Sequence, residues 1–228
     1  MRKSVDFIII GFQGCGTTTL FHHLKNHPQI FMPFNKECNW GNDMDTMSFM
    51  KKYFPKNYPN KKIGHATPSF TYSVDMADIT KEYFADAKLI VITRPRKEQI
   101  RSSWRGRVRR GDEMRTFEEC LEDDFYIERS DFNNLLSKYR KFYKENLLEV
   151  TLPELTNKPE IVMNKIHQFL GVEYFRSPTL GRKYNAGLIK SNKLIRILKK
   201  VPGKELVPQK IRSKIWWFLE IKGRKYKK

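Results

Sequence analysis

The stretch VDFIIIGFQGCGTTTLFHHLK (residues 5–25) decides the fold of this chain. Its first part, residues 5–11, is a short apolar run that is rich in Ile and ends at glycine, which predicts a fully buried β-strand. Thr17–Lys25 has a helical pattern, so the glycine-containing loop at residues 11–18 joins a buried strand to a helix. Backbone N–H groups and a helix N-terminus can bind a phosphate at such a junction.

Further strands and helices alternate along the chain. The predicted strands are Lys88–Thr93, Leu147–Thr151 and a weaker one at residues 63–66, and the predicted helices are residues 100–109, 132–144 and 161–170. Such alternation produces a parallel sheet that is covered on both faces. The expected fold class is therefore α/β, a P-loop-like three-layer sandwich with a central parallel sheet flanked by helices. We expect a single domain over residues 1–228, with a basic helical C-terminal extension from about residue 188.

The positive charge is concentrated near the C-terminus. The formal net charge is +19 and the sequence pI is about 9.8, so anionic partners are expected. Residues 176–228 contain 17 of the 44 Lys and Arg residues but only two acids, Glu205 and Glu220. The rest of the chain is close to balanced, and the basicity is mainly a feature of the tail.

The cysteines and the hydrophobic pattern indicate the compartment. The three cysteines (Cys15, Cys38 and Cys120) are far apart and form no CxxC pair, which counts against a disulfide framework or a zinc site. The apolar run at residues 7–11 is too short for a signal peptide or a membrane span. We therefore expect a cytoplasmic protein.

The loop differs from a nucleotide-triphosphate site. Its spacing resembles the P-loop pattern G-x-x-x-x-G-K-[ST], but Thr17 stands where the lysine is required. Nucleoside triphosphatases also need a strand-end Asp for magnesium, whereas Lys88–Thr93 is followed by Arg94. These features count against an atypical P-loop kinase, which remains an alternative, and favour a phosphate site that needs no metal.

The segment FIIIGFQGCGTTTLFHHLKNHPQI (residues 7–30) resembles the 5′-phosphosulfate loop and first helix of sulfotransferases that use 3′-phosphoadenosine-5′-phosphosulfate (PAPS). The resemblance is closest to the carbohydrate (glycan) sulfotransferases. It implies that the 5′-phosphosulfate is bound by Gln13, Gly14, Cys15, Gly16, Thr17 and Thr18. The family usually has a lysine where this chain has Gly14, and its absence removes a cation that would face developing negative charge.

Two further segments resemble the parts of this family that bind the 3′-phosphate. KLIVITRPRKEQIRSSW (residues 88–104) places Arg94 and Ser102 in the register of the family motif, although Pro95 follows the Arg directly. The guanidinium fork of Arg suits a terminal phosphate. LGRKYNAG (residues 180–187) resembles the segment that closes over the nucleotide, which implies roles for Gly181, Arg182 and Lys183. The arginines that surround Arg94 are typical of a solvated helix.

The catalytic candidates come from two other segments. HPQIFMPFNKECNW (residues 27–40) resembles the stretch that carries the general base, which implies that Glu37 is the base and that Lys36 binds sulfate oxygens or the acceptor. Alternatively, Glu37 is a surface carboxylate paired with a lysine. IGHATPSF (residues 63–70) resembles G-E-K-[ST]-P, with His65 and Ala66 in place of Glu and Lys. His65 is a second candidate for the base or a sulfate ligand, or else a structural histidine.

Residues 210–228 (KIRSKIWWFLEIKGRKYKK) form an amphipathic pattern with a cationic end. Three interpretations stay open: packing on the sheet, peripheral contact with an anionic membrane surface, or attraction of a polyanionic glycan. No nucleic-acid motif is recognised, so nucleic acid is not an expected partner.

The expected function is transfer of a sulfuryl group from PAPS to a hydroxyl or amine of a carbohydrate or glycolipid acceptor, releasing 3′,5′-adenosine bisphosphate. The spacing of His22, His23 and His27 does not place three ligands on one helix face, so no metal is expected. Because lysines are absent at Gly14 and Ala66, a catalytically weakened PAPS-binding protein of the same fold is the main alternative.

Overall fold

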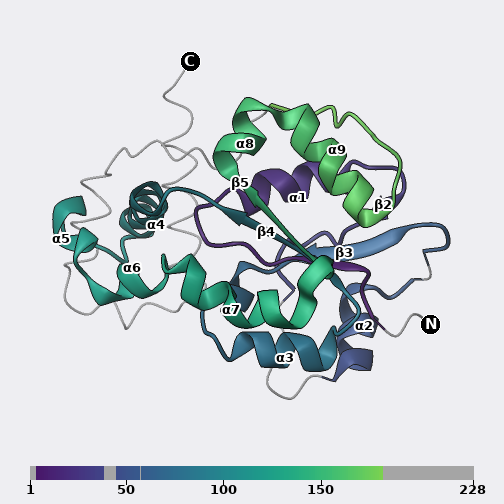
Figure 1. The fold of residues 1–228 in the computed structure, drawn as a ribbon, viewed down its shortest axis with the longest axis horizontal. Coiled ribbons are helices and arrows are strands. Elements are labelled where there is room, and N and C mark those ends of the chain that lie inside the picture. Colours follow the sequence, from purple (N-terminus) through teal and green to yellow (C-terminus); the bar gives the residue numbers. More distant parts are fainter. Residues whose placement is uncertain (1–3, 39–44, 57, 182–228) are drawn as a thin grey trace, which may run out of the picture.

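A computed structural model describes residues 4–38, 45–56 and 58–181 (Figure 1). Within them, one parallel sheet has the strand order β2–β3–β1–β4–β5. Its strands are β1 (Phe7–Ile9), β2 (Ile30–Phe31), β3 (Lys62–Ala66), β4 (Lys88–Thr93) and β5 (Leu147–Thr151). The predicted bounds of β4 and β5 are confirmed, β1 is shorter than predicted, and the two-residue β2 was not predicted.

Helices cover both faces of this sheet. The α-helices are α1 (Thr17–Lys25), α2 (Thr46–Tyr53), α3 (Met76–Tyr83), α4 (Arg96–Arg110), α5 (Phe117–Leu121), α6 (Asp124–Glu128), α7 (Phe132–Tyr143), α8 (Leu152–Asn157) and α9 (Pro159–Leu170), and the 3₁₀ turns are η1 (Pro68–Thr71) and η2 (Lys144–Asn146). Figure 1 shows α1, α8 and α9 on one face and α3 and α7 on the other, with α4, α5 and α6 to one side. The predicted three-layer α/β sandwich is confirmed.

The central strand, β1, is completely buried in the core. The three side chains of β1 are fully buried, since β1 lies between β3 and β4 and has helices on both faces. Phe7 is paired in register with Gly64 of β3, and a Cβ atom on Gly64 would lie 2.5 Å from the Phe7 ring. Glycine at this position therefore lets the largest side chain of β1 lie against the neighbouring strand.

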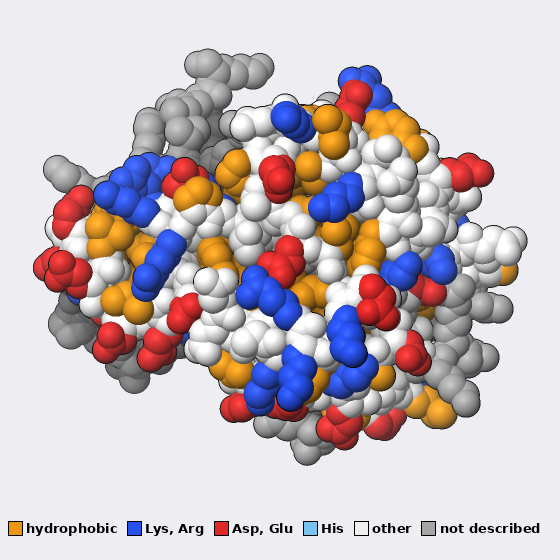
Figure 2. Space-filling model, viewed as in Figure 1, with side chains coloured by type: hydrophobic (Ala, Val, Ile, Leu, Met, Phe, Trp, Pro, Cys, Tyr) orange, Lys and Arg blue, Asp and Glu red, His pale blue; other side chains and the backbone are white. Residues whose placement is uncertain are grey.

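Charges of both signs are mixed on the surface of the body. On the face shown in Figure 2, Lys and Arg side chains alternate with Asp and Glu over the helices. One such pair joins α7 to β5, where the Arg140 guanidinium donates to both oxygens of Glu149 at 2.6 and 2.8 Å. The predicted basic tail begins at Arg176 and lies mostly outside the described residues, as does the predicted extension from about residue 188.

Glu113 lies in the loop between α4 and α5 and connects it to α6 through hydrogen bonds. Its carboxylate is buried and accepts hydrogen bonds from the Arg115 guanidinium, the Tyr126 hydroxyl and two backbone N–H groups. Tyr126 belongs to a small hydrophobic cluster that α4, α5 and α6 share. These hydrogen bonds, above all those from the Arg115 side chain, lower the pKa of Glu113 to about 2.

This environment predicts an acid-sensitive contribution to stability. Because the pKa of Glu113 lies below its ordinary value of 4.5, the ionised carboxylate stabilises the folded chain above that pH, and the contribution is lost as pH falls toward 2. We expect Glu113→Gln to reduce the free energy of unfolding by about 2 kcal/mol at pH 7. Denaturant unfolding at pH 7 and pH 3 measures this, with exposed Glu118→Gln as the control. Equal stabilities of the two variants at pH 7 would contradict it.

Candidate functional site

The loop between β1 and α1 forms a tight turn that ends at an open helix N-terminus. The Cys15 N–H donates to the Phe12 carbonyl at 3.1 Å, and Gly14 has φ +85°, as the third residue of a type II turn requires. Gly16, the N-cap of α1, has φ +95° and supplies no side-chain cap. The Thr19 N–H donates to the Gly16 carbonyl at 2.9 Å, and the positive end of the helix dipole at this end of α1 favours an anion.

The start of α4 lies against this turn. The Arg94 Nη1 donates to the Gly14 carbonyl at 2.9 Å, and the Gln99 Nε2 donates to the Gln13 carbonyl at 3.1 Å. A Cβ atom on Gly14 would lie 2.9 Å from the Ser102 Oγ. The structure therefore brings together the two segments that were predicted separately for the 5′ and 3′ ends of the nucleotide.

Arg94 keeps a donor for a ligand. Its Nη2 pairs with the Glu98 carboxylate at 2.8 Å, and its side chain is only 20% exposed. Its Nε is buried and has no hydrogen-bond partner among the described residues. A buried donor without a partner is unfavourable, and a phosphate oxygen would satisfy it with a charge-assisted hydrogen bond. The residues present thus fit a nucleotide phosphate.

The side chains of the loop itself point in different directions. Cys15 is fully buried, and burial raises the pKa of its thiol to about 12. Thr17 is also buried, and its methyl group lies 2.9 Å from where a Cβ atom of Gly11 would be. Cys15 can therefore contribute to a phosphate site only through its backbone, whereas Thr18, which is partly exposed, can also offer its side chain.

This geometry predicts the effect of restoring the lysine that the resemblance led us to expect at residue 14. Gly14→Lys would force a side chain into a positive-φ conformation and against Ser102, so we expect it to weaken binding of 3′,5′-adenosine bisphosphate about tenfold rather than to raise activity. Calorimetry measures the affinity. Gly171→Lys is a matched control, because Gly171 has φ +70° with no atom within 4 Å of an added Cβ. A gain in turnover for Gly14→Lys would contradict this account.

Lys36 and Glu37 lie beside the carboxyl end of β3. The Ala66 N–H donates to the Lys36 carbonyl at 3.2 Å, which brings the two predicted catalytic segments into contact. The Glu37 carboxylate accepts a hydrogen bond from the Lys36 ammonium at 3.1 Å. The Glu37 side chain is 54% exposed and that of Lys36 is 19% exposed. The pairing anticipated for a surface carboxylate is present, and it leaves Glu37 accessible to an acceptor.

His65 lies in the core. It is fully buried on β3 among the rings of Phe49, Phe70 and Phe84, with centroids 5.4 to 6.1 Å away. Its Nδ1 lies 2.8 Å from the Thr67 Oγ1, and its Nε2 has no partner among the described residues. Burial lowers its pKa to about 3, which keeps the ring neutral. Of the roles left open for His65, this environment favours the structural one.

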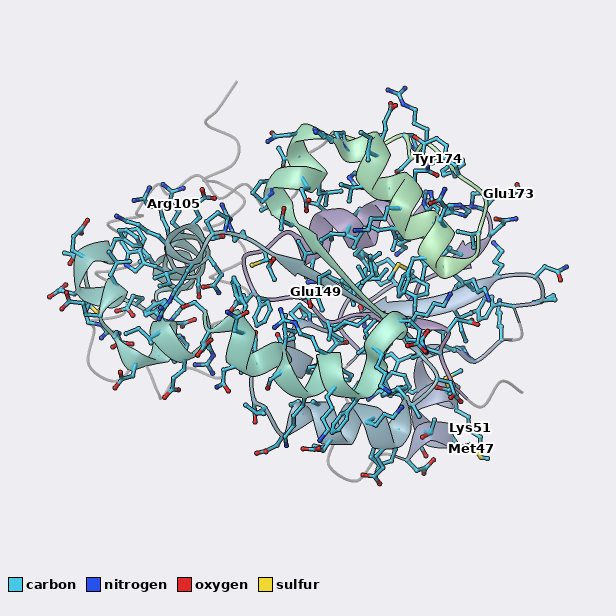
Figure 3. The ribbon with its side chains drawn as sticks, viewed as in Figure 1. Met47, Lys51, Arg105, Glu149, Glu173 and Tyr174 are labelled. Atoms are coloured by element: carbon cyan, nitrogen blue, oxygen red, sulfur yellow. The ribbon has the colours of Figure 1, made fainter. Side chains whose placement is uncertain are left out.

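The third predicted part of the nucleotide site follows α9. Before it reaches residues 180–187, the chain passes through Glu173 and Tyr174, which Figure 3 labels, and returns to α1, where the Thr179 Oγ1 lies 3.1 Å from the His23 Nδ1. Gly181 has φ +82° with no atom near a built Cβ. The other two predicted residues lie outside the described residues: Arg182 and Lys183.

Several residues that shape the site were not predicted. Glu98 and Gln99 lie within the motif at residues 88–104, four and five residues after Arg94. This spacing from Arg94, on the first turn of α4, was the signal in the sequence that could have identified them. Arg101 and Arg105 are exposed on α4, as the solvated-helix interpretation predicted for the neighbours of Arg94; Figure 3 labels Arg105.

Across the described part of the chain, no group of three His, Cys, Asp or Glu residues is placed to bind a metal ion. None of the described helices combines the length and hydrophobicity needed to cross a membrane.

Comparisons with solved structures agree with this fold. A sulfotransferase from Alicyclobacillus acidocaldarius aligns with a TM-score of 0.64 and 18% identity, over 87% of this chain and 91% of the other. A mouse sulfotransferase complexed with PAP aligns with a TM-score of 0.55 and 19% identity, over 77% and 60%. A sulfotransferase domain from the curacin biosynthetic pathway aligns with a TM-score of 0.54 and 18% identity, over 82% of each chain. These likenesses show the fold.

A search of curated proteins found no significant match. The family comparison is more direct, because a family model described as the sulfotransferase domain matches residues 4–180. The match includes the β1–α1 loop, the start of α4, and the segment of Lys36 and Glu37. The chain therefore belongs to the sulfotransferase domain family.

Proposed function

We propose that this sulfotransferase uses PAPS and transfers its sulfuryl group to a hydroxyl or amine of a carbohydrate or glycolipid acceptor. The observation that carries the proposal is the contact between the β1–α1 loop and Arg94, because it joins candidate sites for the two phosphate ends of one nucleotide. When bound, PAPS supplies an activated sulfuryl group. The mouse sulfotransferase of the same fold was solved with PAP, and we take this to be the desulfated product, 3′,5′-adenosine bisphosphate.

The nucleotide would be held by groups from both sides of the contact. The backbone of residues 13–18 and the N-terminus of α1 would bind the 5′ end, since these groups carry partial positive charge. The buried Nε of Arg94 and the hydroxyl of Ser102 would bind the 3′-phosphate. Gly181, Arg182 and Lys183 would complete that site. Neither end requires a metal ion in this arrangement.

Glu37 and Lys36 would act on the acceptor. Glu37 would accept the proton that the acceptor hydroxyl or amine loses as it attacks, and its exposure lets an acceptor reach it. The Lys36 backbone is hydrogen-bonded to Ala66, the position where the resemblance places a lysine in the family. Lys36 would therefore supply positive charge near that position and stabilise the negative charge that develops during transfer.

An acceptor screen tests this proposal. The chain is incubated with PAPS and a panel of oligosaccharides, glycolipids and amines, and release of 3′,5′-adenosine bisphosphate is measured for the wild type and for Lys36→Met. We expect release that depends on a carbohydrate or glycolipid and that falls at least tenfold in the variant. Release that is independent of every acceptor, or that is equal in Lys36→Met, would contradict it.

A second candidate, a PAPS-binding protein with weak turnover, is favoured by one observation. The backbone conformation of Gly14 and the nearness of Ser102 leave no room for the lysine that the resemblance implies at that position. Under this alternative, the nucleotide binds tightly but no acceptor increases the release of bisphosphate. The acceptor screen therefore separates the two functions.

A further inference from the structure

We infer that Gln99 is a positioning residue for the loop at residues 11–18, a role that rests on the proposed function. Gln99 lies on the first turns of α4 and is only 2% exposed. Its Nε2 donates to the Gln13 carbonyl at 3.1 Å, so a buried amide of one helix is attached to the central peptide of the turn.

The bond fixes the orientation of a peptide plane. In a trans peptide the C=O and the N–H point in opposite directions, so the Gly14 N–H points away from Gln99. Arg94 holds the next carbonyl, that of Gly14, at 2.9 Å. Two consecutive carbonyls are thus turned toward the start of α4. Since type I and type II turns differ by a flip of the central peptide, Gln99 selects the conformation in which Gly14 has its positive φ.

The environment of the Gln99 Oε1 indicates that the Nε2 donor is the atom that orders the loop. The Gln99 Oε1 is buried and has no hydrogen-bond partner among the described residues. An unpaired buried oxygen destabilises the fold, and Met would fill the same space without it. The reverse orientation of the amide would place two carbonyl oxygens against each other at Gln13, so the observed orientation is the favourable one. We infer that the cost of the unpaired Gln99 Oε1 is offset by the hydrogen bond from Nε2 to the Gln13 carbonyl, which orders the loop.

Gln99→Met removes the donor and keeps the size of the side chain. We expect affinity for 3′,5′-adenosine bisphosphate to fall about tenfold, because the loop that binds the 5′ end loses its fixed conformation. Affinity for adenosine 3′-monophosphate, which lacks the 5′ group, should not change. Thr80→Val is the control, because it removes the hydrogen bonds that the Thr80 hydroxyl makes with the Met76 carbonyl and the Tyr139 hydroxyl. Thr80 lies on α3, which packs with α7 on the sheet face opposite α1 (Figure 1). The Thr80→Val change should lower stability and leave both affinities unchanged.

Amide hydrogen exchange of residues 12–18 tests the same role without ligand. Exchange there should be faster in Gln99→Met and unchanged in Thr80→Val. Unchanged exchange, or an equal loss of affinity for both nucleotides, would overturn the positioning role. If the wild-type chain binds no bisphosphate, the proposed function fails, and hydrogen exchange alone then decides whether Gln99 fixes the loop.

Discussion

Replacing Glu37 with Gln is expected to lower the rate of sulfuryl transfer about a hundredfold, because the amide cannot accept the proton of the acceptor. Affinity for 3′,5′-adenosine bisphosphate should stay within about twofold of the wild type, since Glu37 lies beside β3 and contacts neither the loop nor Arg94 in any hydrogen bond of the described residues. Initial rates at saturating PAPS and calorimetry with the bisphosphate measure the two quantities.

The control for this variant is Glu122→Gln, which removes a carboxylate from an exposed position on the α5–α6 side of the molecule. It should change neither the rate nor the affinity. A Glu37→Gln variant with the full wild-type rate would show that Glu37 is not the base. A variant with lowered affinity and an unchanged rate would place Glu37 in nucleotide binding instead.

Replacing Arg94 with Ala is expected to weaken binding of the bisphosphate about a hundredfold, which corresponds to about 3 kcal/mol. Two effects combine. The variant loses the guanidinium that would bind the 3′-phosphate, and it loses the hydrogen bond that holds the Gly14 carbonyl. Glu98 also loses its partner, which leaves an unpaired carboxylate next to an anion site. Calorimetry measures the change.

Lys97→Ala is the matched control for Arg94→Ala, since Lys97 is exposed on the first turn of α4, three residues after Arg94, and carries the same charge. It should weaken binding by less than about threefold, because long-range interactions between exposed charges are screened by salt. If Arg94→Ala and Lys97→Ala weaken binding equally, the field of α4 rather than a specific contact attracts the nucleotide.

Much of the fold could be predicted because its two central strands, β1 and β4, are buried along most of their length. Continuous apolar runs gave the bounds of β4 and the position of β1, and the helical pattern gave the bounds of α1. The bounds of β5 were predicted although Glu149 interrupts its apolar residues. The two residues of β2 are too few for any periodicity. The first turn of α4 was missed because residues 96–99 are all polar, and helix signals depend on apolar spacing.

The part of the site that could be predicted is the one formed by loops that follow adjacent strands of the sheet. β1 and β4 are adjacent and parallel, so the loops that follow them meet at one edge of the sheet. The details depend on contacts between residues far apart in sequence. The bond from Gln99 to Gln13 leaves no pattern in either segment. The burial of His65 results from rings on α2, on η1 and at the residue that follows α3, so the sequence left its role open.

Calorimetric binding of 3′,5′-adenosine bisphosphate, with ATP plus magnesium as the comparison, tests the central claim most directly. The loop and Arg94 offer donors for two separate phosphates, and β4 is followed by Arg94 rather than by an acid that could hold magnesium. We predict that the bisphosphate binds more tightly than ATP, with or without magnesium. Absence of binding, or tighter binding of ATP with magnesium, would contradict the use of PAPS and favour a kinase-like or purely charge-driven interaction.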